Sequence, residues 1–80
     1  MPIEYKKNRA TFHGEASVEE AEGLLEWLQN RSNAEVDLSA CSHMHTANLQ
    51  VLMAARCGIF SWPENAELRT WLEPALKTGD

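Results

Sequence analysis

Two segments of the chain place apolar residues at every third or fourth position, which is typical of an amphipathic helix. The stripe of the first segment consists of Ala21, Leu24, Leu25 and Leu28. The stripe of the second consists of Leu68, Trp71, Leu72 and Ala75. Ser17 and Glu20 match a capping box before the first of these helices. Asn65 is the expected N-cap of the other, and Pro74 should end or bend its last turn.

Four segments are predicted as strands. The clearest runs from Ala34 to Ala40, where apolar and polar residues alternate strictly, as in a strand with one buried face. Residues 1–16 predict two short strands, joined by a tight turn near Asn8 and closed by Gly14. Residues 59–62 predict the fourth.

Residues 47–56 are apolar almost all round, which predicts a third helix that is mostly buried. Gly58 would end this helix as a left-handed cap, and a polar loop at residues 41–45 would precede it. The order β-β-α-β-α-β-α predicts one domain over residues 1–80, with residues 77–80 as a tail. Its class is α/β, with a small mixed β-sheet packed against helices.

Composition and charge narrow the class of protein. The net charge of -5 argues against a nucleic-acid-binding protein, which would normally show a basic face. No apolar run approaches the roughly 18 residues of a membrane span, and the first residues lack the apolar core of a secretory signal. Cys41 and Cys57 are too few for a disulfide framework. We therefore expect a cytoplasmic domain without membrane insertion.

Four pieces of the sequence, in this order, resemble the STAS domain, the fold of bacterial anti-anti-sigma factors. They are Phe12–Ala16, Glu35–Ser39, His45–Gln50 and Ile59–Leu72. The resemblance implies a non-enzymatic protein-interaction domain in bacterial regulation, which docks on an anti-sigma kinase or another signalling protein. The polar contacts would come from the loop and start of the second helix: His43, His45, Thr46, Asn48 and Gln50.

The chain departs from the family at the phospho-acceptor motif, Asp-Ser-Ser-Gly-Leu. In regulatory members a partner kinase phosphorylates the second Ser, and that position is Ala47 here. His45, Thr46 and Asn48 replace the Asp, the first Ser and the Gly. Thr46 therefore has two candidate roles, as the N-cap of the helix starting at Ala47 or as a phosphorylation switch. A Thr at this motif also resembles accessory STAS subunits of lipid-type ABC transporters, which is an alternative function.

Cys41, His43 and His45 form a run with metal-ligand chemistry. In an extended loop the three would share one side, and all are good zinc or copper ligands. Their spacing matches none of the familiar closed zinc sites, so a small metal-binding protein is a third hypothesis and we expect no cofactor. The alternative is that Cys41 is buried at the end of the strand and that the histidines are exposed or cap the next helix. No Gly-rich phosphate loop is present and neither cysteine has a base in a designed geometry, so we expect no enzyme activity.

Two features bear on partners. The tryptophans are expected in packing, although an exposed Trp27 or Trp62 would be a candidate for docking. Typical STAS domains continue with another strand and a terminal helix after the region matched here. An open sheet edge at that place would favour a homodimer, because unpaired strand groups seek a partner.

Overall fold

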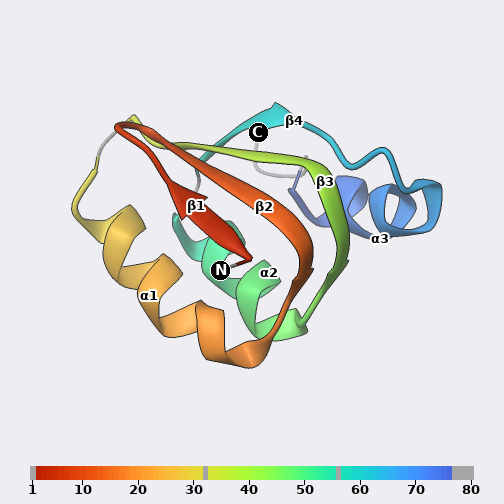
Figure 1. Cartoon of the computed structure of the whole chain (residues 1–80), viewed down its shortest axis with the longest axis horizontal. Helices are drawn as coiled ribbons and strands as arrows, with labels where there is room; N and C mark the ends of the chain where they lie inside the picture. The colour runs from red at the N-terminus through yellow and green to blue at the C-terminus, as the bar shows by residue number, and fades with distance from the viewer. Residues whose placement is uncertain (1, 32, 56, 77–80) are drawn as a thin grey trace.

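We describe residues 2–31, 33–55 and 57–76 of a computed structural model of the chain. The elements, in chain order, are β1 (Ile3–Tyr5), β2 (Arg9–Ala16), α1 (Val18–Gln29), β3 (Glu35–Met44), α2 (Thr46–Ala55), β4 (Gly58–Ser61) and α3 (Ala66–Leu76). This is the predicted order of strands and helices (Figure 1). The expected helix end at Arg56 and the expected tail at 77–80 lie outside the described residues.

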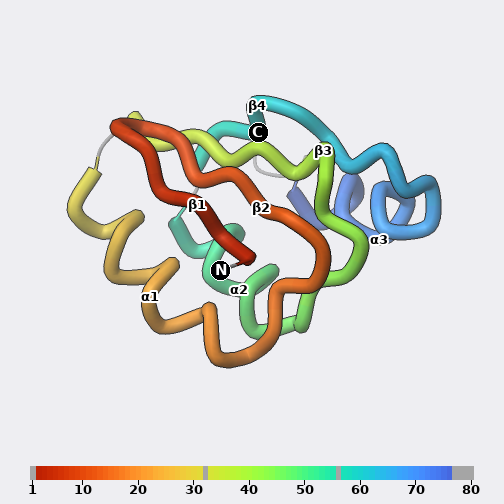
Figure 2. Tube along the Cα trace, in the orientation of Figure 1, coloured from red at the N-terminus to blue at the C-terminus, as the bar shows by residue number. Residues whose placement is uncertain are grey.

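The four strands form one mixed sheet in the order β1-β2-β3-β4. β1 pairs antiparallel with β2, and the predicted turn between them is closed by the Lys6 N–H, which donates to the Arg9 carbonyl at 2.8 Å. β2 and β3 pair in parallel, as do β3 and β4, so α1 and α2 are crossover helices (Figure 2). The predicted fold class, a small mixed sheet with helices, is confirmed.

The described helices contribute to a core on one face of this sheet. In β2 and β3 the side chains of Phe12 and Val36 are fully buried, whereas those of Thr11 and Asp37 are partly exposed on the opposite face. Each helix adds leucines to the same core: Leu24 and Leu28, Leu49 and Leu52, Leu68 and Leu72. α1 and α2 lie side by side, and α3 packs against α2 and β3 (Figure 1).

β3 is longer than the sequence predicted, because residues 41–44 continue the strand instead of forming a loop. Its pairing with β2 shifts register twice, and each shift places one extra residue in β3. The extra residues break the strict alternation of buried and exposed side chains. Ala40, expected on the buried face, is therefore exposed, while Cys41 and Met44 point into the core.

Two glycines differ from expectation. Gly14 does not close β2, which continues to Ala16, but its backbone has φ of 70° beside the second register shift. Gly58 is not a left-handed cap: it begins β4, and Gly14 is the only described glycine with positive φ.

α2 is less buried than its composition predicted. Its buried residues are Asn48, Leu49 and Leu52, whereas Met53 is 47% exposed. The sheet covers one side of the helix and its neighbours flank it, so its outer side stays in contact with water. An apolar composition all round predicted a covered helix, and no described element covers this side.

The predicted starts of α1 and α3 agree with the structure. The Glu20 carboxylate accepts hydrogen bonds from the Ser17 backbone N–H at 3.1 Å and from the Ser17 hydroxyl at 2.7 Å. The Asn65 side chain accepts the Leu68 N–H at 2.9 Å, as expected of an N-cap. Pro74 does not end α3, which continues to Leu76.

Gly14 and Gly23 provide a matched pair of substitutions. We expect Gly14→Ala to lower the free energy of unfolding by about 1–2 kcal/mol, because a Cβ disfavours the left-handed region. Gly23→Ala should raise it by up to about 1 kcal/mol, because Gly23 lies inside α1 and an added Cβ would meet only the Tyr5 hydroxyl oxygen, at 3.8 Å. Urea denaturation measures both. Equal effects of the two substitutions would contradict the assigned role of Gly14.

Candidate functional site

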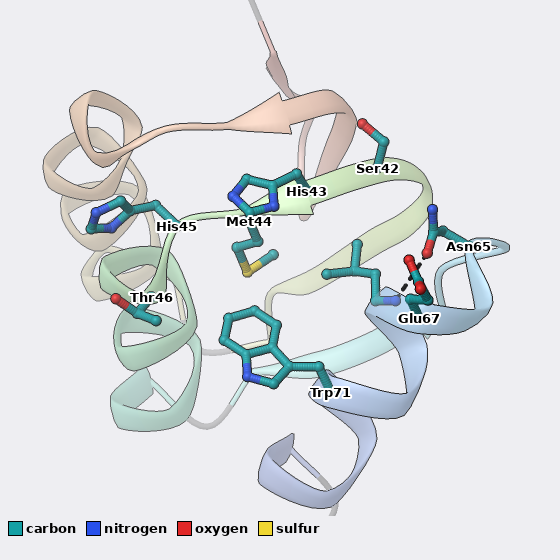
Figure 3. A pocket seen from close by; sticks show the side chains of 9 residues that line it. Ser42, His43, Met44, His45, Thr46, Asn65, Glu67 and Trp71 are labelled. Carbon is teal, nitrogen blue, oxygen red and sulfur yellow. Dashed lines mark hydrogen bonds between the residues drawn. The ribbon is translucent and has the colours of Figure 1, made fainter.

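A cleft of about 420 Å³ opens where the end of β3, the first turn of α2 and α3 meet. We call it the β3–α2 cleft. In Figure 3 the side chains of Met44 and Trp71 point toward one another across it, while His45 and Ser42 lie at its outer edge. Met44 is 1% exposed and Trp71 is 41% exposed. The cleft therefore combines an apolar floor with a polar rim, a combination suited to binding.

His45 caps α2. Its ring Nδ1 accepts a hydrogen bond from the Ala47 N–H at 3.0 Å, and its carbonyl accepts the Asn48 N–H at 2.9 Å. Thr46 is exposed and is already the first residue of the helix. The interpretation of Thr46 as the N-cap is therefore wrong, because the ring one residue earlier takes the position of the capping acceptor.

Asn48 is not a surface residue, contrary to its predicted role in partner contacts. Its side chain is fully buried, and the amide nitrogen donates to the carbonyls of Ala16 at 3.2 Å and Ser17 at 2.8 Å. These bonds connect α2 to the junction of β2 and α1. Asn48 therefore positions the start of α2 and does not contact a partner.

The remaining predicted contact residues divide between two places. His43, His45 and Thr46 line the β3–α2 cleft (Figure 3). Gln50 lies on the other side of α2, in a groove that this helix forms with α1. The structure thus brings together three of the five predicted side chains.

The three predicted metal ligands do not come together. Cys41 is buried and its thiol donates to the His43 carbonyl at 3.4 Å, while the side chain of His43 is exposed. The extra residue at Ser42 breaks the alternation that would have put these side chains on one side. In residues 2–31, 33–55 and 57–76 no group of three His, Cys, Asp or Glu side chains could hold a metal ion.

The two thiols have little nucleophilic character. Burial raises the pKa of the Cys41 thiol above its ordinary value, and burial likewise raises the pKa of Cys57. At neutral pH both remain protonated, and the thiolate is the reactive form of cysteine.

Sequence reasoning missed the part that α3 plays in the cleft. Trp71 falls on the predicted apolar stripe, yet only Leu68 and Leu72 of that stripe are buried. Leu68 and Leu72 are four residues apart and therefore lie on the same side of the helix. This spacing is the feature of the sequence that could have identified the buried side of α3. The other tryptophan on a helix, Trp27, is half-buried and lies against Tyr5 with ring centroids 5.3 Å apart.

No family model, no curated protein and no solved structure matches the chain. Within the described ranges, no helix has both the length and the apolar character needed to cross a membrane.

The capping role of His45 can be separated from that of Thr46. We expect His45→Ala to lower the free energy of unfolding by about 1 kcal/mol, because the Ala47 N–H loses its acceptor. His45→Asn should retain most of the stability, since Asn is a good N-cap. Thr46→Ala is the control and should have the smaller effect. Chemical denaturation that found Thr46→Ala more damaging than His45→Ala would contradict this assignment.

Proposed function

We propose that this chain is a non-enzymatic, STAS-like protein-interaction domain of bacterial regulation that docks on a signalling partner through the β3–α2 cleft. The observation that carries the proposal is the exposed Thr46 at the first position of α2, on the same cleft as His43, His45 and an exposed Trp71. The resemblance at residues 45–50, which include His45 and Thr46 of the cleft, supports the same surface. An anti-sigma kinase or a related regulator is the expected class of partner.

The side chains of the cleft suit a protein partner. Trp71 offers a large apolar surface, and tryptophan is enriched among the residues that contribute most to binding energy. His43 on β3, His45 just before α2 and Glu67 on α3 add polar groups around it. An apolar anchor with a polar rim is the usual anatomy of an interface.

Phosphorylation of Thr46 would change this surface without unfolding α2. A phosphate adds close to two negative charges, and the first turn of a helix favours negative charge because its backbone N–H groups point toward it. The same charge would repel an acidic partner surface. Thr46 is thus a candidate switch although Ala47 occupies the family's acceptor position.

Thr46→Glu tests the proposal. We expect tagged wild-type protein and Thr46→Ala to capture the same partner from the native bacterium, and Thr46→Glu to lose it. A glutamate at the first helical position suits the helix dipole, so the variant should stay folded, which thermal unfolding checks. Thr70→Glu is the matched control, because Thr70 is exposed on α3 but does not line the cleft. Intact-mass spectrometry of native protein reports a phosphate.

The results of this capture experiment distinguish docking at the cleft from its absence, and one candidate function from the other. Loss of the partner in Thr46→Glu and in Trp71→Ala, with retention in Thr70→Glu, supports docking at the cleft. Retention in all variants contradicts it. The captured protein distinguishes a kinase-like regulator from the ATPase of a lipid-type ABC transporter, the alternative favoured by a Thr at this motif.

A further inference from the structure

α1 carries a second apolar stripe in addition to its buried one. Val18, Ala21 and Leu25 follow one another at intervals of three and four residues and line the groove between α1 and α2. Val18 is 54% exposed and Leu25 is 36% exposed. This side of α1 therefore presents apolar surface to water that no described element covers.

α2 faces the groove with a similar spacing. Ala47, Val51 and Ala54 line it at intervals of four and three residues, and Gln50 lies beside them. The groove has a volume of about 500 Å³. Two of the four α2 residues in it are alanines, and small side chains let another helix approach closely.

The shape of the groove fits a helix. Each stripe spans two turns, or roughly 10 Å at a rise of 1.5 Å per residue. Two parallel ridges of this kind form a channel in which a third helix can pack at an axial distance of about 8–10 Å. An occupant of about three turns would cover both stripes.

The charge around the groove indicates what kind of helix could bind there. Glu19 and Glu22 line it, and no Lys or Arg of the described residues does. A second copy docked through this face would set these glutamates against their own equivalents, and an anionic lipid surface would also be repelled. A helix with basic residues beside its apolar stripe satisfies both the shape and the charge.

We propose that the α1–α2 groove binds an amphipathic helix of a partner protein whose apolar stripe is flanked by Lys or Arg. This site lies on the side of α2 away from the β3–α2 cleft and does not involve Thr46. The proposal goes beyond the proposed function, because it adds a second docking surface and the chemistry of what occupies it.

A set of synthetic peptides of about three to four helical turns tests the groove. The first carries Leu at positions i, i+3, i+4 and i+7 with Lys elsewhere, the second replaces Lys by Glu, and the third scrambles the first. We expect only the first to bind by fluorescence anisotropy, with an affinity that falls as salt is added. Amide shifts in a ¹⁵N NMR titration should cluster at residues 18–25 and 47–54.

Two pairs of variants locate the binding surface. Ala54→Lys should weaken binding of the Lys peptide about tenfold, because it fills the groove and repels the peptide. Met53→Lys makes the same charge change on an exposed neighbour outside the groove lining and should leave affinity unchanged. Glu22→Gln should weaken binding about threefold, whereas Glu26→Gln, which changes a glutamate outside the lining, should have no effect.

Three results would overturn the proposal: no binding of the Lys peptide, equal binding of the Glu or scrambled peptide, or equal affinity for Ala54→Lys and wild type. Circular dichroism and thermal unfolding of each variant confirm that it is folded. The pull-down with Thr46→Glu bears on the cleft alone, so the two proposals can fail independently.

Discussion

The position of α2 depends on hydrogen bonds between its first turn and the end of β2. The Ala16 carbonyl accepts the His45 N–H at 2.8 Å and the Asn48 amide at 3.2 Å, and the same amide reaches the Ser17 carbonyl at 2.8 Å. α1 begins directly after Ser17, so this one cluster fixes the starts of both helices. In the low dielectric of the interior such bonds are strong. The cleft and the groove lie on opposite sides of the helix that this cluster holds.

Features set by neighbouring residues were predictable from the sequence. The capping contact of Ser17 with Glu20 joins residues three positions apart, and so does the Asn65 cap. Periodicity in the same way identified Leu24 and Leu28 as core residues of α1. The order of elements followed because each strand and helix carries its own pattern, independent of where it packs.

Features set by distant residues were not predictable. The buried position of Asn48 depends on carbonyls 31 and 32 residues earlier in the chain. The extra residues in β3 exist only relative to β2, so the sequence offered a buried Cys41 as one alternative but could not show where the alternation breaks. In the candidate site, the loop before α2 was found from the sequence, whereas the contribution of Trp71 required the packing of α3 against β3.

The open face of the sheet has a consequence for aggregation. Arg9 on β2 lies with its guanidinium 3.5 Å from the ring centre of Phe60 on the edge strand β4, and it also pairs with Glu35 at 3.3 Å. A charged group above an exposed aromatic ring makes stacking of a second sheet there unfavourable. The edge strands are also short, with three residues in β1 and four in β4. Short edges and charged side chains oppose uncontrolled strand addition. The charged side chains therefore disfavour aggregation through the face of the sheet that no described helix covers.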